Sequence, residues 1–201
     1  MSEETSKNSP IAELYLALRG DILVLIEKEK DSAAQISQSY RRHLIRAVAA
    51  FIEAMTYQLR QVILHCLEPN ARSELFFALK EQQIDIGNNG IIQSKRLRTG
   101  SIALIKFSLR TFDDLFGTDL CPDFDTILFR NLVDTFSVRD RLMHPKTLED
   151  LAISDEEFNA ALDAFSLIET VFGNTVSKSN EIIAAKLRAI ILQLEEKNKN
   201  G

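Results

Sequence analysis

The chain is organised around residues 44–66, LIRAVAAFIEAMTYQLRQVILHC, which carry its clearest helical pattern. Apolar side chains recur at positions 44, 48, 51, 55, 59, 62 and 66. Their mean spacing is close to the helical repeat of about 3.6 residues. The opposite face carries Arg42, Arg46, Glu53, Tyr57 and Arg60, and a charged face of this kind is more often solvated than part of a site. We therefore expect a long second helix from about 36 to 67.

Helical periodicity also fills most of the remaining chain, whereas alternating strand patterns are scarce. Helical patterns cover about 10–30, 71–81, 100–116, 122–144, 155–172 and 179–197. The turn signal Gly87-Asn88-Asn89-Gly90 lies between two Ile-rich pieces and predicts a loop or a small hairpin. These patterns predict an all-α fold: an up-down helical bundle with a long second helix and a short irregular or hairpin insertion near 82–98.

Local signals set the expected ends of several helices. Pro122-Asp123 predicts a helix start, because acidic residues are favourable at the positive end of a helix. Ser154 and Glu157 have the spacing of a capping box, which predicts a helix from about Asp155. Gly173-Asn174 predicts the end of that helix.

Composition excludes several classes of protein. The 201 residues are 45% hydrophobic and 26% charged, which is ordinary for a folded soluble domain. A net charge of −5 argues against a protein that coats nucleic acid non-specifically. The polar start and the lack of about 18 consecutive uncharged apolar residues argue against a signal peptide and a membrane span. We expect a cytoplasmic protein with a disordered tail over 1–9 and a single domain over 10–201.

One short segment brings groups of catalytic type together: Val138-Arg139-Asp140-Arg141-Leu142-Met143-His144-Pro145-Lys146. Pro145 disfavours helical geometry at the residue before it, so the helix should end close to His144. A fixed positive charge beside an imidazole can bind a phosphate and move a proton near neutral pH. Asp140 lies four residues before His144 and could fix the tautomer of the ring, while Arg141 and Lys146 add positive charge.

Two other interpretations of these residues stay open. Arg139 to His144 could simply be a solvated, charged helix end, with His144 interacting with the last carbonyls. Arg60 and His65 repeat the same spacing, but in a regular helix they point roughly 140° apart, so we interpret His65 as structural. The basic stretch with Lys95, Arg96 and Arg98 could contact a phosphate backbone, although such clusters are common on ordinary surfaces.

The run from Val138 to Pro145 resembles the signature of the HEPN superfamily, in which an Arg is followed by a polar residue, a few variable residues and a His. Residues 46–57, RAVAAFIEAMTY, resemble the early helix of many stand-alone bacterial HEPN proteins, which carries a Glu, here Glu53. The resemblance covers about residues 36–172. HEPN domains are helical bundles. Many are metal-independent ribonucleases of toxin–antitoxin, abortive-infection and CRISPR-linked systems, and others are non-catalytic modules for dimerisation or for binding protein or RNA.

The resemblance implies an endoribonuclease with catalytic Arg139 and His144, in which Asp140 is the polar residue after the Arg. The resemblance gives Glu53 a supporting role. From their charge alone, we expect Arg141 and Lys146 to support the site and Arg46, Lys95, Arg96 and Arg98 to contact RNA. The site would form where two copies meet in a homodimer, without metal or cofactor, in a toxin, phage-defence or stress context. The implied partners are RNA and a cognate antitoxin or another protein. Lys146 stands where one toxin subgroup has a Tyr, which separates this chain from that subgroup. The alternative is the non-catalytic HEPN-like module.

Overall fold

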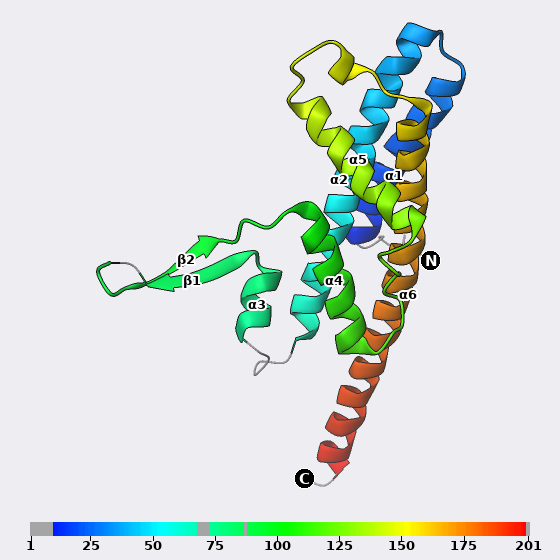
Figure 1. Ribbon diagram of the computed structural model, residues 1–201. Helices are drawn as coiled ribbons and strands as arrows, with labels where there is room; N and C mark the ends of the chain where they lie inside the picture. The colour runs from blue at the N-terminus through cyan, green and yellow to red at the C-terminus, as the bar shows by residue number, and fades with distance from the viewer. Residues whose placement is uncertain (1–9, 68–72, 87, 200–201) are drawn as a thin grey trace, which may run out of the picture. The chain divides into compact units, whose positions relative to one another are not determined.

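The computed structural model describes residues 10–67, 73–86 and 88–199, so the predicted tail over 1–9 and Gly87 of the predicted turn lie outside the described residues. In chain order the elements are α1 (Pro10–Lys30), α2 (Ala34–Cys66), α3 (Ser73–Leu79), β1 (Gln82–Ile86), β2 (Ile92–Arg96), α4 (Ser101–Phe116), α5 (Ile127–Met143), the 3-10 turn η1 (Glu149–Leu151) and α6 (Asp155–Lys199) (Figure 1). The predicted all-α fold with a hairpin insertion is confirmed. Among these helices, none combines the length and the apolar character that crossing a membrane requires.

The chain divides into two compact units, which we describe separately. The first unit is formed by residues up to Gln58, Gly100–Ile105 and Asp123–Ile168. The second is formed by Leu59–Thr99, Lys106–Pro122 and the chain from Glu169 onward. Helices α2, α4 and α6 each contribute residues to both units. The single HEPN-like domain over 10–201 stays a prediction.

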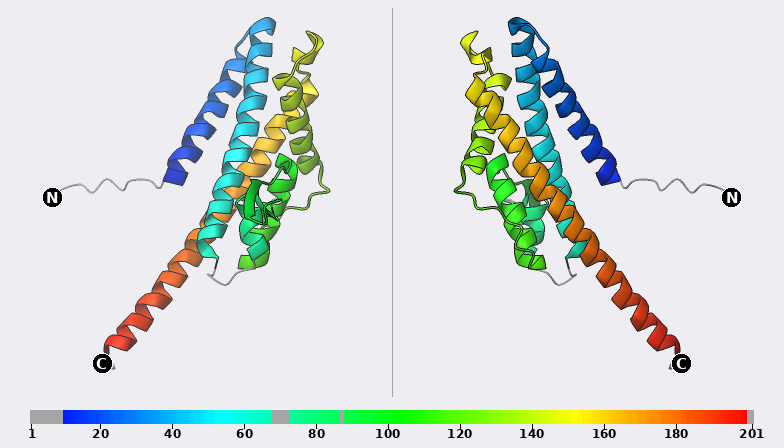
Figure 2. Two further views of the ribbon diagram at one scale, coloured as in Figure 1. Left: turned by 90° about the vertical axis from the view of Figure 1, so that its left-hand side faces the viewer. Right: turned by 90° about the vertical axis from the view of Figure 1, so that its right-hand side faces the viewer.

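The core of the first unit is built on the apolar stripe of α2. Leu44, Val48, Phe51 and Met55 are all buried, as their spacing predicts. The ring of Phe51 lies 5.7 Å from that of Tyr15 on α1 and 5.3 Å from that of Phe165 on α6, centroid to centroid. The start of α2 lies side by side with α1, α5 and the start of α6 (Figures 1 and 2). The long helix is therefore the axis against which α5, the helix of the Arg/His motif, is packed.

Helix α5 begins later than the sequence indicates. The predicted start near Pro122-Asp123 is wrong, because residues 124–126 form a turn and the helix begins at Ile127. Asp123 accepts a hydrogen bond from the backbone N–H of Asp125, which closes a turn outside the helix. Thr126 is the N-cap: its hydroxyl accepts from the N–H of Phe129 at 3.3 Å. The side chains of Asp123 and Thr126 accept hydrogen bonds from backbone N–H groups. These bonds favour a turn over a helix at 122–125.

Helix α6 continues through Gly173-Asn174, so the predicted end near Phe172 is wrong. Glycine costs a helix interior about 1 kcal/mol relative to alanine, but it does not break the hydrogen-bond ladder. Val171, Phe172 and Thr175 are buried on both sides of Gly173, and Thr175 donates its hydroxyl to the carbonyl of Val171 at 2.7 Å. Burial across this segment outweighs the weak local preference of one glycine.

The insertion of the second unit is a two-stranded antiparallel hairpin. Its register pairs Gln82 with Arg96, Ile84 with Ser94 and Ile86 with Ile92. Gly90 in the connecting turn has a φ of +74°, a conformation that glycine adopts without strain. Buried Leu79 ends α3 just before the hairpin, and α3 packs against β1.

Candidate active site

Arg139 lies one turn before the end of α5, and its side chain is held on three sides. The Nη2 atom donates to Glu53 Oε1 on α2 at 2.9 Å, and Nε lies 3.1 Å from Asp140 Oδ1. The guanidinium carbon lies 5.1 Å from the ring centroid of Phe136, one helical turn earlier, within range of a cation–π contact. The side chain is only 23% exposed. Nη2 is the one nitrogen of the guanidinium that makes a hydrogen bond within the described residues: Nε is buried and lies near Asp140 without hydrogen-bond geometry, and Nη1 makes none.

Glu53 is the acidic partner of this arginine, although 86 residues separate the two in the sequence. The hydroxyl of Ser101, the first residue of α4, donates to the same Oε1 atom at 2.8 Å. Glu53 therefore links α2, α4 and α5 within the first unit. The structure brings Glu53 and Arg139 together. The resemblance gives Glu53 a supporting role in the site, and that role stays a prediction. Ser101 was not expected, and no motif in the sequence marks it.

His144 is the C-cap of α5, which confirms the predicted end of that helix. Its backbone has left the helical region (φ −133°, ψ 53°), and its N–H donates to the carbonyl of Arg141 at 3.3 Å. The imidazole is exposed and makes no hydrogen bond or ion pair to any other described residue. The carboxylate of Asp140 lies against Arg139, and no hydrogen bond joins it to His144 among the described residues. The imidazole is therefore free to meet a substrate or a second chain.

Two arginines of α2 are used to hold the end of α5 and the loop that follows it. Arg46 Nη2 donates to the carbonyl of Leu142 at 3.0 Å, and Arg42 Nη1 donates to the carbonyl of Leu151 at 3.1 Å. Helix-terminal carbonyls have no partner within their helix, so these donors satisfy groups that would otherwise face water. The expectation that this face of α2 is simply solvated is wrong for both arginines. The role of Arg46 in RNA contact stays a prediction.

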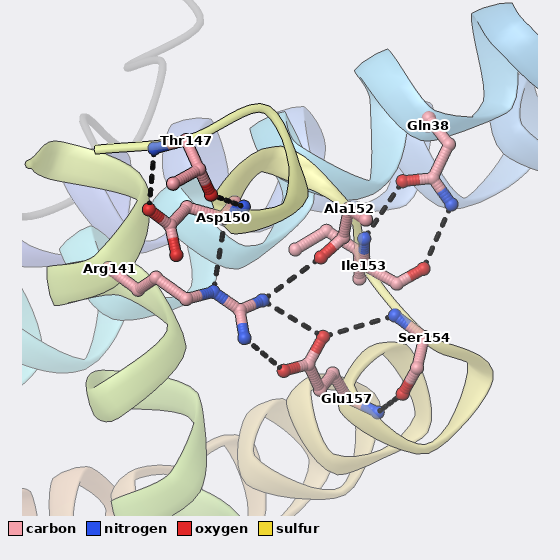
Figure 3. A network of polar contacts seen from close by, with 8 residues as sticks. All are labelled: Gln38, Arg141, Thr147, Asp150, Ala152, Ile153, Ser154 and Glu157. Carbon is pink, nitrogen blue, oxygen red and sulfur yellow. Dashed lines mark hydrogen bonds and ion pairs between the residues drawn. The ribbon is translucent and has the colours of Figure 1, made fainter. Parts of the chain in front are cut away.

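Arg141 is the centre of a polar network that fixes the loop after His144 (Figure 3). It forms a two-pronged ion pair with Glu157, Nη1 to Oε1 at 2.8 Å and Nη2 to Oε2 at 3.1 Å. It also donates to the carbonyls of Asp150 and Ala152, at 3.2 and 3.0 Å. Two further bonds join the side-chain amide of Gln38 on α2 to the backbone of Ile153. Arg141 therefore holds the loop that follows His144, while its predicted role in supporting the site stays a prediction.

Glu157 and Asp150 complete this network. Glu157 and Ser154 exchange the two hydrogen bonds of a capping box, which confirms that prediction. Asp150 accepts from the backbone N–H groups of Lys146 and Thr147, and these bonds lower the pKa of its carboxyl. The main chain at Lys146 is therefore held in place, and its side chain is exposed. Glu157 could be anticipated from the capping box, whereas Gln38 and Asp150 carry no comparable signal.

We expect Arg141→Ala to lower the free energy of unfolding by about 2 kcal/mol, because it removes a partly buried ion pair and two bonds to loop carbonyls. Urea denaturation measures this loss, and limited proteolysis should show faster cutting between Pro145 and Ile153. Arg130→Ala is the matched control, since Arg130 is an exposed arginine of the same helix. It should change stability by no more than about 0.5 kcal/mol.

The same ion pair predicts how this stability depends on pH. Burial raises the pKa of the Glu157 carboxyl, but hydrogen bonds from Arg141 and the Ser154 N–H outweigh burial and leave the pKa below its ordinary value. A depressed pKa contributes stability above the unfolded value of about 4.3 and loses it as the pH falls through the folded value. The gap between wild type and Arg141→Ala should therefore narrow below about pH 4. An equal gap at pH 7 and at pH 3 would contradict this role of Arg141.

The remaining sequence-predicted residues lie in the second unit. Lys95 forms an ion pair with Asp85 across the hairpin, and Arg96 Nη2 lies 3.6 Å from Glu81 Oε2. Arg98 is exposed and has no such partner among the described residues. In the second Arg/His match, Arg60 is buried and pairs with Glu81 at 2.7 Å, whereas His65 is exposed. The structural interpretation of His65 is therefore not supported by burial, and Arg60 is committed to an internal ion pair.

Within the described ranges, no three His, Cys, Asp or Glu side chains lie close enough together to hold a metal ion. Among the described residues, neither Cys66 nor Cys121 forms a disulfide. Comparison of the chain with protein-family models, with curated proteins and with solved structures finds no match. The HEPN resemblance thus depends on the residues quoted above, and a function argued from it is a proposal.

Proposed function

We propose that the chain is a metal-independent endoribonuclease of HEPN type, active as a homodimer. One observation supports this most: Glu53, distant in sequence, holds the guanidinium of Arg139 one turn before the exposed imidazole of His144. A phosphate-binding cation and a proton-transfer group thus share one helix end of the first unit. We also propose a role as a toxin or in phage defence, which is supported by the HEPN resemblance alone.

The proposed chemistry needs only these side chains and the RNA itself. The 2′-hydroxyl of a ribose attacks the adjacent phosphorus, and an imidazole removes its proton. The bond to the 5′-oxygen of the next nucleotide breaks, and a second imidazole donates a proton to that oxygen. The products are a 2′,3′-cyclic phosphate and a free 5′-hydroxyl. Because each chain supplies one His144, two chains would supply both the base and the acid.

Arg139 is suited to the charge that develops in this reaction. Its Nη1 donors take no part in the bond to Glu53 or in the ion pair with Asp140, and a planar guanidinium binds phosphate oxygens through parallel hydrogen bonds. The carboxylate of Glu53 would hold the other edge of the guanidinium in place. A fixed donor of this kind stabilises a transition state without reorganising at the moment of reaction.

A non-catalytic dimerisation or binding module is the second candidate. The observation that favours it is that Arg139 already faces two carboxylates, Glu53 and Asp140, which a phosphate would have to tolerate. Arg139 would then join helices α2 and α5 and take no part in chemistry. The two candidates differ in whether any RNA is cut.

The test is cleavage of a labelled, mixed-sequence RNA by the purified chain in excess EDTA. We expect fragments that end in 2′,3′-cyclic phosphate. We also expect no cut where the scissile nucleotide carries a 2′-deoxyribose, since the attacking hydroxyl is then missing. Cleavage that requires added Mg²⁺, or that proceeds equally at the deoxy position, would contradict the proposed reaction. An RNA pool left intact would favour the non-catalytic module.

A further inference from the structure

The β-hairpin of the second unit exposes an apolar face. Directly paired residues of an antiparallel hairpin lie on the same face, as do alternate residues of one strand. The register therefore places Ile84, Ile86 and Ile92 together, and they are 46%, 69% and 70% exposed. Ile91, next to the turn, is 60% exposed. An isolated two-stranded hairpin is marginal in water, and four exposed isoleucines make this one a surface in need of a partner.

The hairpin also has one open edge. The N–H of Leu97 donates to the carbonyl of Glu81 at 2.7 Å, which sets the pair of Glu81 and Leu97 at a hydrogen-bonding position of the ladder, although the N–H of Glu81 donates to Ala78. Because such pairs alternate along an antiparallel ladder, the N–H and C=O groups of Ile92, Ser94 and Arg96 point away from β1. Within the described residues the sheet has only two strands, so no third strand pairs with this edge of β2.

The outer edge of β1 is less accessible than that of β2. The carboxylate of Asp85 accepts a hydrogen bond from the N–H of Ile86 at 2.9 Å, which occupies an edge donor. Helix α3 also lies at the start of β1 (Figure 1). An added strand therefore has one suitable place, along β2.

The charge beside β2 is positive, although the whole chain carries −5. Lys95, Arg96 and Arg98 line a hollow of about 480 Å³ together with Gln83 and Leu97. Lys80 adds a further cation to a neighbouring hollow of about 280 Å³. Of the two carboxylates on the hairpin, Asp85 pairs with Lys95, and Glu81 is held mainly by buried Arg60. This edge thus favours an acidic occupant and repels the β2 edge of a second copy, which carries the same cations.

The side chains of the hairpin favour protein over nucleic acid. Single-stranded RNA binds to platforms of aromatic side chains on which its bases stack. Residues 80–99 contain four isoleucines and no aromatic residue. We propose that the open edge of β2 binds an extended, acidic segment of a partner protein, which adds as a third strand with alternating apolar and acidic side chains. Its apolar side chains would cover the isoleucine face, and its carboxylates on the opposite face would meet Lys95. Arg96, which the register places on the isoleucine face, and Arg98 beyond the strand would meet carboxylates at the end of the segment. This proposal is independent of RNA cleavage.

The test is the fluorescence anisotropy of a labelled nine-residue peptide of alternating Val and Glu, titrated with the full chain at low salt. We expect saturable binding that weakens as salt is added, and at least about tenfold weaker binding when Lys replaces Glu in the peptide. Ser94→Pro should abolish binding, because it blocks the open edge without removing a bond to β1. Ile84→Pro, compared with Ile84→Ala, is the matched control. Both variants remove the same isoleucine from the apolar face, but only Ile84→Pro adds a proline, on the outer edge of β1, so the two should bind the peptide equally.

Arg98→Glu is a second variant, which leaves the backbone of the hairpin intact because Arg98 is exposed and lies outside β2. We expect it to weaken peptide binding about tenfold. If Arg98→Glu weakens binding but Ser94→Pro does not, the contact is electrostatic only and strand addition is wrong. Equal binding of the Glu and Lys peptides would also overturn the proposal. So would binding of a labelled 12-nucleotide uridine RNA in place of the acidic peptide, which would assign this surface to RNA.

Discussion

His144→Ala and Arg139→Ala should each reduce RNA cleavage by at least a hundredfold. General acid–base catalysis by a positioned side chain contributes about 10²–10⁴-fold, and removing one transition-state donor costs about 10²–10³-fold. Arg139→Lys keeps the charge but loses the planar pair of donors, so we expect activity between those of wild type and Arg139→Ala. The measurement is the initial rate of cleavage of one labelled RNA in EDTA at equal chain concentration.

Controls must separate lost chemistry from lost folding. The His144 imidazole makes no hydrogen bond to a described residue, so its removal should change stability by no more than about 0.5 kcal/mol. Arg139→Ala removes a partly exposed ion pair with Glu53, for which we expect about 1 kcal/mol or less. His65→Ala is the matched activity control, because His65 is also exposed and follows an arginine at the same spacing. It should cleave at the wild-type rate. If His144→Ala cuts RNA as fast as wild type, His144 is not the proton-transfer group.

Glu53→Gln tests the positioning of the guanidinium. The amide keeps the size of the side chain and removes its charge, so Arg139 loses its electrostatic anchor but keeps all its donors. A loss of cleavage smaller than that of Arg139→Ala is the expected result if Glu53 acts only through Arg139. A larger loss would mean that Glu53 contacts the substrate itself.

The sequence predicts the helices well where burial and local signals agree. The stripe of α2 from Leu44 to Leu59, the capping box of Ser154 and Glu157, and the stop at Pro145 are each favoured by periodicity or by a short motif, and each is confirmed. Val62 and Cys66, at the end of the predicted stripe, are only partly buried. The two wrong helix ends, at Pro122 and Gly173, depend on a single weak signal. At Pro122, side-chain caps at Asp123 and Thr126 compete with the helix. At Gly173, buried neighbours outweigh the preference of glycine for a helix end.

Contacts across the fold could not be predicted in the same way. The motif identifies Arg139. The motif does not show that Ser101 and Arg139 both donate to Glu53, because this depends on how three helices pack. The contacts of the charged face of α2 could not be predicted either. Arg42, Arg46 and Arg60 all donate to backbone carbonyls of residues far away in sequence. A helical period distinguishes apolar from polar faces. It does not distinguish arginines that remain in water from arginines that satisfy buried carbonyls.

Glu81→Gln should lower the free energy of unfolding by about 3 kcal/mol, although it changes one atom in a side chain near the surface. Arg60 is only 6% exposed, and its Nη1 lies 2.7 Å from Glu81 Oε1. Removing one partner of a buried ion pair costs about 3–5 kcal/mol, because the remaining charge loses the opposite charge that compensated its burial. Glu81 is 22% exposed, so water can replace part of what is lost, and we expect the low end of that range. Glu81 also has a φ of +53°, a conformation that is unfavourable for residues other than glycine. Glutamine leaves this backbone energy unchanged, so the substitution tests the ion pair alone.

Substitution of the other partner, Arg60, distinguishes the cost of burying a lone charge from the loss of a contact. Arg60→Met removes the guanidinium together with its desolvation cost and leaves Glu81 to Arg96 and water, so we expect a loss of about 1 kcal/mol. The double variant should then be more stable than Glu81→Gln alone, because it no longer buries a guanidinium that has lost the Glu81 carboxylate. Urea denaturation of the four proteins measures both differences. If Glu81→Gln matches wild type within about 0.5 kcal/mol, or if the double variant is the least stable of the four, Arg60 is not a buried charge that depends on Glu81.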